Sequence, residues 1–385
     1  MLIMLITADK IHDGQNWMPE GTVLELDEKG TILAIHNDSK KPGATHYDGI
    51  LCPGFVNVHC HMELSHMKGV IAEGLGLIPF LKHIPAYRDT FSEEQKKAVR
   101  HEAYAEMQAN GIVAVGDIAN TAETLDIRAL DKLHVHTFVE SIGFTEERAE
   151  MMMGFARNVY DQYEAQQPRS KILRQSIVPH APYSVSSGLF KLINSHRPQS
   201  LISIHNQESE AEHEFYMNKS GLVNELLAAM GINIDFFAPS GRSSLSTYVS
   251  YFEKEHSFIF VHNTYTGLED AALGHAHFAE AWWCLCPNAN LYIENRLPDI
   301  PMLMSEARNI CIGTDSLASN HQLSILSELQ SINKQYPEIG WETLLRWGTS
   351  NGARALRMAD VVGSISVGMQ PGLAVIMGEK VTRIV

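Results

Sequence analysis

The chain has 385 residues, of which 45% are hydrophobic and 19% are charged, and its formal net charge is −15. This composition is typical of a soluble globular protein and argues against disorder. The acidic balance disfavours a nucleic-acid partner. The five cysteines are few and odd in number, which indicates reduced thiols and a cytoplasmic protein. No apolar run is long enough to span a bilayer, so we expect no membrane partner.

Both ends of the chain are predicted to form short strands. Apolar runs such as 21–26 and 31–36 are separated by turns, and the C-terminal residues show the same pattern of short apolar runs and turns. Neither end buries enough surface to form a core alone. We therefore predict one small composite β-sandwich built from residues 1–49 and 360–385.

Residues 50–359 repeat the order strand, loop, helix. Ser92 and Gln95 form a predicted capping box at the start of a helix that ends near Asn110. Eight apolar runs are predicted strands: 50–58, 112–118, 133–140, 171–179, 201–205, 257–262, 281–286 and 309–313. Eight such units predict an α/β fold with a (β/α)8 TIM barrel as the catalytic domain. A doubly wound sheet would require a Gly-rich phosphate turn after its first strand, and the sequence has none there.

The first predicted strand ends in His59 and His61. Their i, i+2 spacing places both imidazoles on one face of a strand. Two neutral nitrogen ligands that converge on one point are typical of part of a zinc-type site. The sequence has two further His-x-His pairs, at 134/136 and 275/277, but neither lies where a strand gives way to a loop.

Four later strand ends carry a histidine or an aspartate at the equivalent point of the repeat: His180, His205, His262 and Asp315. In such barrels the carboxyl ends of the strands carry the chemistry. We predict that His59, His61, His205 and Asp315 bind one divalent metal ion, with Zn²⁺ first and Fe²⁺ as the alternative. A site for two metals usually needs a bridging carboxylate, often a carbamylated lysine, where this chain has His180.

Three of the predicted site residues carry the proton chemistry. A bound metal lowers the pKa of its water toward neutrality. Asp315 can accept a proton from that water, and His262 can orient it. Glu208, three residues past His205, can shuttle a proton to the substrate. The alternative interpretation of Glu208 is a helix N-terminal carboxylate stabilised by the helix dipole.

Four other residues are candidate substrate contacts. Glu140 ends the third predicted strand, and Tyr183 follows His180. Glu63 either faces the substrate or supports a metal ligand from behind. Arg296 either binds an anionic group of the substrate or is a solvated loop cation.

These stretches resemble the amidohydrolase superfamily. They resemble its mononuclear aminohydrolase branch, which includes deaminases of guanine, of methylthioadenosine and S-adenosylhomocysteine, and of aminofutalosine, and the triazine chlorohydrolases. The matching stretches follow the family's order over nearly the whole chain: 53–65, 179–183, 205–209, 261–262, 286–290, 313–316 and 349–356.

The resemblance implies a role for each of the site residues named above. It implies metal ligation by His59, His61, His205 and Asp315, proton transfer by Glu208, water activation by His262 with Asp315, and substrate contact by His180. It also implies the composite β-sandwich and a homodimer.

The function that the resemblance implies is hydrolytic deamination of an amino-substituted nitrogen heterocycle, with release of ammonia. Hydrolysis of a C–Cl or cyclic amide bond in the same site is an alternative. A catalytically inactive scaffold is a third, although the predicted ligands and both proton-handling residues are all present. Residues 74–81 are expected to line the pocket and differ from the purine deaminase pattern, so the substrate is left open.

Overall fold

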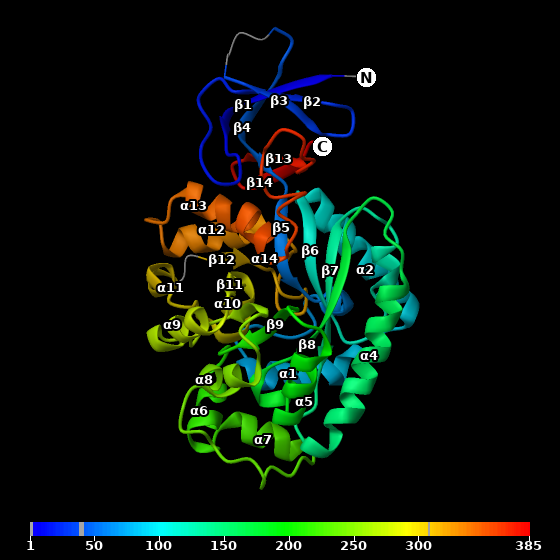
Figure 1. Ribbon diagram of the computed structural model, residues 1–385, viewed down its shortest axis with the longest axis vertical. Coiled ribbons are helices and arrows are strands. Elements are labelled where there is room, and N and C mark those ends of the chain that lie inside the picture. Colours follow the sequence, from blue (N-terminus) through cyan, green and yellow to red (C-terminus); the bar gives the residue numbers. More distant parts are fainter. Residues whose placement is uncertain (1–2, 38–41, 307–308) are drawn as a thin grey trace.

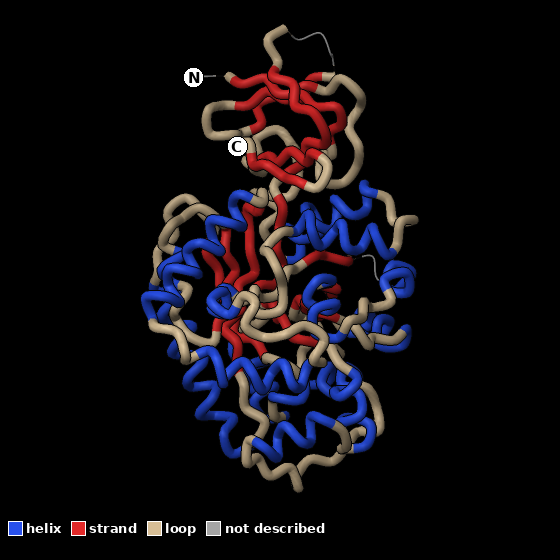
Figure 2. The backbone as a smooth tube through the Cα atoms, turned by 180° about the vertical axis from the view of Figure 1, so that it is seen from behind, coloured by secondary structure: helices blue, strands red, loops and turns tan. Residues whose placement is uncertain are grey.

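The computed structural model describes residues 3–37, 42–306 and 309–385. A small sheet that carries both chain ends lies above a larger part that contains most of the helices (Figure 1). The back view shows the same division, with helices around the strands of the larger part (Figure 2). Residues 1–2 and 38–41 of the predicted terminal unit lie outside the described residues.

Strands from both chain ends share one six-stranded sheet with the order β14-β13-β4-β1-β2-β3. β4 is its link between the two ends, because it pairs in parallel with β1 and antiparallel with β13. The sandwich arrangement and the boundaries at residues 49 and 360 stay predictions. The strands are β1 (Met4–Ile11), β2 (Val23–Leu26), β3 (Ile32–His36), β4 (Thr45–Pro53), β13 (Leu373–Met377) and β14 (Lys380–Arg383).

The run 50–58, predicted as one strand, is divided between two sheets. β4 ends at Pro53 and β5 begins at Phe55. The amide of Gly54 donates to the carbonyl of Gly372 (2.9 Å), whereas the amide of Phe55 donates to Gly111 (2.8 Å). A Cβ on Gly54 would meet Val113 Cγ1 at 2.2 Å, so only glycine fits at this crossing. The prediction of a single strand was therefore wrong.

Eight strands of the larger part run parallel in two four-stranded sheets, β5-β6-β7-β8 and β12-β11-β10-β9. Backbone hydrogen bonds link the two sheets at both edges, from His205 to the carbonyl of His180 (2.9 Å) and from Thr314 to that of His59 (3.0 Å). The seven later predicted strands are each confirmed to within two residues at either end. The bounds are β5 (Phe55–Cys60), β6 (Ile112–Ala119), β7 (His134–Ser141), β8 (Leu173–Pro179), β9 (Leu201–Asn206), β10 (Ser257–His262), β11 (Glu280–Leu285) and β12 (Ile310–Ile312).

Helices follow most of these strands. The predicted capping box is confirmed, since the Ser92 amide donates to Gln95 Oε1 (2.8 Å) and the Gln95 amide donates to Ser92 Oγ (3.3 Å). The helices are α1 (Leu77–Arg88), α2 (Glu93–Ala109), α3 (Leu125–Arg128), α4 (Ala149–Ala165), α5 (Ser187–His196), α6 (Glu210–Asn218), α7 (Leu222–Ala229), α8 (Ser244–Tyr248), α9 (Leu268–His277), α10 (Pro287–Glu294), α11 (Ile300–Glu306), α12 (Ile325–Gln335), α13 (Trp341–Arg346) and α14 (Gly352–Ala355).

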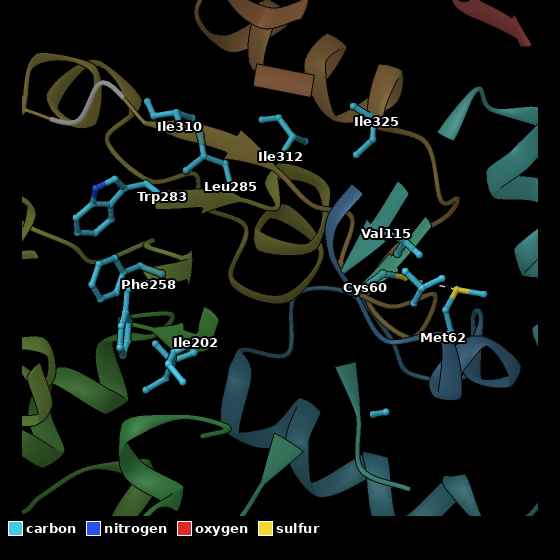
Figure 3. Close-up of a cluster of buried hydrophobic side chains, with 14 of the residues drawn as sticks. Cys60, Met62, Val115, Ile202, Phe258, Trp283, Leu285, Ile310, Ile312 and Ile325 are labelled. Carbon is cyan, nitrogen blue, oxygen red and sulfur yellow. Dashed lines mark hydrogen bonds between the residues drawn. The ribbon is translucent and has the colours of Figure 1, made fainter. Parts of the chain in front are cut away.

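The main apolar core contains side chains from neighbouring parallel strands. Ile202, Phe258, Trp283 and Ile310 come from β9 to β12 and form a row of fully buried side chains (Figure 3). Because side chains alternate along a strand, the neighbours of these residues point to the opposite face of the sheet. All five cysteines are buried and unpaired. Within the described residues, no helix combines the length and apolarity that crossing a bilayer requires.

Candidate active site

The carboxyl end of β5 brings His59 and His61 together. Their ring centroids lie 4.9 Å apart, and both side chains are buried. The amides of Thr314 and Asp315 both donate to the carbonyl of His59 at 3.0 Å. These bonds fix the end of β5 against the segment that follows β12, which carries Asp315.

His205 and Asp315 complete the predicted set of four. Nε2 of His205 lies 3.2 Å from Nε2 of His61. Oδ1 of Asp315 lies 3.4 Å from Nε2 of His61 and 3.5 Å from Nε2 of His59. The ligand-type atoms of His59, His61 and His205 all lie within 4.8 Å of one another, as do those of His59, His262 and Asp315. The structure therefore brings all four predicted ligands to one point, with His262 beside them.

Hydrogen bonds behind the site orient two of the imidazoles. Nδ1 of His205 donates to the carbonyl of His180 (2.8 Å), and Nδ1 of His262 donates to Oδ1 of Asn290 (2.9 Å). Asn290 Nδ2 is itself used as a donor to Thr264 Oγ1 (2.8 Å), which fixes the orientation of the amide. Each ring therefore keeps an unprotonated Nε2 directed into the site, as metal ligands and proton acceptors require.

The protonation states of the four residues suit a cation. Burial lowers the pKa of His61 to about 3 and lowers that of His205 well below its ordinary value, so these rings are neutral at pH 7. Burial alone would raise the pKa of Asp315, but the neighbouring ring nitrogens of His59 and His61 hold it well below its ordinary range. Three neutral nitrogens and one carboxylate form a donor set that zinc-type ions prefer.

A buried ring that lacks hydrogen bonds supports the same assignment. His59 is fully buried, and neither of its nitrogens has a hydrogen-bond partner in the described part of the chain. Buried polar atoms are nearly always satisfied, so such an orphan marks a place where an ion or water binds. The residues present therefore fit a divalent metal ion.

The backbone is strained where three strands end. Gln207, His262 and Asp315 have φ angles of 46°, 72° and 56°, in the left-handed region that non-glycine residues rarely adopt. Such residues persist only when surrounding contacts hold them, and they cluster at functional sites. Each of these three residues changes the direction of the backbone at or just after the end of a strand that carries a site residue.

Glu208 lies beside His262 at the edge of this cluster. Its Oε1 is 3.6 Å from Nε2 of His262, and the side chain is buried. Burial, together with the charge of Asp315, raises the pKa of Glu208 well above its ordinary value. The raised pKa favours the protonated form of this carboxyl group, which can act as a proton donor.

A second buried carboxyl group holds the turn that carries Glu208. Oε1 of Glu212 accepts from the amide of Gln207 (3.1 Å) and from Oγ of Ser244. Burial raises the pKa of Glu212 to about 8. Glu212 does not line the cavity described next, so its contacts support the turn from behind.

A cavity of about 660 Å³ opens over the cluster. Its inner end is lined by the polar residues His61, His205, Glu208, His262 and Asp315. The predicted contacts His180, Tyr183 and Glu140 also line it. Burial lowers the pKa of His180 to about 4, so its ring is neutral at pH 7, and raises that of Glu140 to about 7, so this carboxyl group titrates near neutral pH.

The structure does not bring Glu63 or Arg296 to the cavity. Glu63 accepts from the amide of Asn120 (3.0 Å) and lies 3.4 Å from the guanidinium of Arg88. Arg296 is exposed and lies over the ring of Tyr265, at 4.4 Å from its centroid. These positions favour the supporting role for Glu63 and the solvated loop cation for Arg296.

Two further cavity residues are not evident from the sequence. Asn120 follows β6, and its Nδ2 donates to Oε2 of Glu140 (2.8 Å). The sequence signal that could have identified Asn120 is its position directly after the second parallel strand, because the other site residues also lie at or after strand ends. Arg88 ends α1 and gives no such signal.

The other His-x-His pairs lie elsewhere. His134 and His136 are buried in β7, where His136 Nε2 bonds Ser176 Oγ (3.0 Å). His275 lies on α9 and accepts from Nε1 of Trp283 (3.0 Å). Both pairs have structural partners, as their positions in the sequence suggested.

Comparison with known proteins gives relatives over most of the chain. A Helicobacter pylori adenosine deaminase is 26% identical over 347 residues, covering 87% of this chain and 81% of the relative. A Nitratiruptor aminodeoxyfutalosine deaminase is 26% identical over 365 residues, covering 92% of this chain and 84% of the relative.

Solved structures share the fold. The Helicobacter pylori aminofutalosine deaminase in complex with methylthio-coformycin superposes with a TM-score of 0.81 at 20% identity, covering 99% of this chain and 100% of that one. An adenosine deaminase from Xanthomonas campestris with bound zinc gives a TM-score of 0.72 at 22% identity, covering 96% of this chain and 84% of that one. The model of the Amidohydrolase family matches residues 50–384, and the chain therefore belongs to that family.

Proposed function

We propose that this protein is a metal-dependent hydrolase that removes the amino group of a nitrogen heterocycle as ammonia. The observation that carries the proposal is the convergence of His59, His61, His205 and Asp315 beside the Glu208–His262 pair, at the polar end of one cavity. Relatives named as deaminases match 87% and 92% of the chain. Adenine nucleosides are the first candidates, since one relative is named for adenosine and the structural neighbour holds methylthio-coformycin.

We infer that the eight parallel strands close into the predicted (β/α)8 barrel and that both termini form the predicted sandwich. The hydrogen bonds at both edges of the two sheets and the TM-score of 0.81 support the barrel. All parallel strands then present their carboxyl ends on one face, which is where such barrels place their active sites.

We propose that His59, His61, His205 and Asp315 hold one divalent ion. Zinc is the first candidate because of this donor set and the zinc-bound neighbour, and iron is the alternative. The chemistry that a bound ion supplies is a water with a pKa lowered toward neutrality.

The remaining steps belong to side chains of this chain. Protonated Glu208 donates to the ring nitrogen next to the carbon that carries the amine, which makes that carbon electrophilic. His262, with its free Nε2, and the carboxylate of Asp315 orient the attacking water and take up its proton. Water oxygen bonds to the carbon, and the proton taken up from the water passes to the amine. The C–N bond then breaks with its electron pair leaving on ammonia, and the proton of the added hydroxyl group returns to Glu208. A carbonyl group remains where the amine was.

His180, Tyr183 and Glu140 are proposed to position the heterocycle, since all three line the cavity. Fixed orientation of the reacting groups contributes a large share of catalysis in such sites. We further propose a cytoplasmic enzyme, as the five buried free thiols suggest. The homodimer stays a prediction that light scattering can test.

The test is an ammonia-release assay on zinc- and iron-loaded protein with aminopurines, aminopyrimidines, pterins and nucleosides. We expect turnover of at least one adenine nucleoside. Turnover of a chlorotriazine, an imide or a hydantoin without any ammonia would support the alternative hydrolytic reactions instead. A protein that binds no metal and turns over none of these compounds would be a scaffold.

A further inference from the structure

The cavity has two chemically different ends. Outside the polar cluster, most of its wall is formed by apolar side chains of three segments that are far apart in sequence, and Lys82, Arg88, Thr145 and Arg148 of these segments also line it. The segments are α1, the segment from the end of β7 into α4, and α7 with the residues after it. α1 and α7 lie close together below the parallel strands (Figure 1).

Each segment contributes several large apolar side chains to this wall. Leu77, Phe80, Leu81 and Ile84 come from α1. Ile142, Phe144 and Met152 come from the second segment, and Leu226, Leu227, Met230 and Ile232 from the third. We call these eleven residues the apolar wall. Most of them belong to, or pack against, one hydrophobic cluster.

The apolar wall continues to the protein surface. Ile142 and Met230 line the cavity and are nevertheless 42% and 64% exposed. Phe236, which is 52% exposed, lies 5.7 Å from the ring of Phe144 and extends the same surface. Large apolar side chains gathered at the rim of a cavity are typical of a ligand-binding groove.

A bare nucleoside does not account for this surface. Ribose hydroxyls need hydrogen-bond partners, which the leucine, isoleucine and phenylalanine side chains of the wall do not offer, so a bare nucleoside leaves the apolar wall uncovered. A cavity of about 660 Å³ is also in the range of sites for drug-sized ligands, roughly 300–1,000 Å³.

We propose that the substrate is a heterocycle carrying an extended apolar substituent, which lies along the apolar wall while the amino group faces Glu208. This inference rests on the proposed deamination and adds the chemical class of the substituent. The substituent is longer than a methylthio group, because the eleven apolar side chains of the wall present more surface than one methylthio group can cover.

The test uses a series of 5′-alkylthio adenosines from methyl to hexyl, with uncharged ether chains of equal length as polar controls. The chains carry no charge, so Lys82 and Arg148 at the cavity edge do not contribute. Each buried methylene is worth ~0.8 kcal/mol, which predicts a rise in kcat/KM of about fourfold per carbon until the wall is covered. The ether chains should show no such rise.

Two pairs of variants locate the effect. Met152→Ser and Met230→Ser remove wall residues, and Met151→Ser and Met377→Ser are matched controls at exposed positions outside the cavity. We expect the ratio of kcat/KM for the hexyl and methyl substrates to fall about tenfold in the wall variants and to stay constant in the controls. Met230 is well exposed, so its replacement should not prevent folding.

Several results would overturn this inference. A series that is flat or falling from methyl onward would show that nothing extended binds to the wall. If kcat/KM does not change along the series and the Met230→Ser substitution dissociates a dimer, the wall is instead a contact with a second copy of the chain.

Binding constants measured on the metal-loaded protein separate this inference from the proposed deamination. Affinity that rises with chain length without ammonia release would refute the deamination and support the apolar site.

Discussion

Replacing Glu208 with glutamine tests the proton chemistry of the site directly. The two side chains have the same shape, and Glu208 is only 5% exposed, so the cavity should keep its form. The raised pKa of Glu208 favours the protonated form of the wild-type group, which can donate its proton, whereas the amide of glutamine cannot transfer one. General acid catalysis contributes about 10²–10⁴-fold, so we expect kcat for ammonia release to fall by that factor. This corresponds to about 3–5 kcal/mol at 1.36 kcal/mol per tenfold change in rate.

The assay pairs kcat with metal content, because Glu208 is outside the four proposed ligands. Glu210→Gln makes the same chemical change two residues away, on the exposed first residue of α6, and should leave both quantities unchanged. A Glu208→Gln enzyme with kcat within tenfold of wild type and full metal occupancy would refute the role as proton donor. Loss of metal in that variant would instead make Glu208 a ligand.

Three further predictions concern the metal, the orientation of His262 and stability. His61→Ala should lower metal affinity by at least about 100-fold, because loss of a residue that only supports a ligand costs about 10–100-fold. The control variant His275→Ala, on α9, should retain the metal, as measured by mass spectrometry. Asn290→Ala should lower kcat about 10–100-fold with metal retained, because His262 loses the acceptor that fixes its tautomer; unchanged kcat would contradict this. Glu212→Gln should gain stability relative to wild type as pH rises. The folded pKa of about 8 exceeds the ordinary 4.5, so between these values the unfolded chain releases a proton that the folded chain keeps. The wild-type free energy of unfolding should fall over this range by at most about 5 kcal/mol relative to the variant, and urea titrations at pH 5 and pH 8 that give equal differences would contradict it.

Much of the site could be predicted because its residues follow strands in a repeat. His59, His205, His262 and Asp315 lie at or just after the ends of apolar runs, and local sequence carries that signal. The division of residues 50–58 could not be predicted in the same way. It depends on Gly372 and Gly111, which accept from successive amides and are distant in sequence.

The cavity wall was harder to predict for a related reason. Residues 74–81 were expected to line the pocket, and Leu77, Phe80 and Leu81 do so. Met152 and Met230 belong to two other segments, and each pattern alone indicates ordinary packing of an amphipathic helix. Only the tertiary arrangement shows that they share one cavity. Arg88 and Asn120 became evident for the same reason, through their contacts with Glu63 and Glu140.

The central place of β4 also constrains the order in which the protein can fold during synthesis. β4 lies between β1, made shortly before it, and β13, made after almost all of the rest of the chain. At about 5–20 residues per second, the β13 side of β4 stays an open edge for tens of seconds. Unpaired edges invite pairing with other chains. The docking of β13 and β14 therefore completes the molecule, and a nascent chain is most exposed to aggregation just before that step.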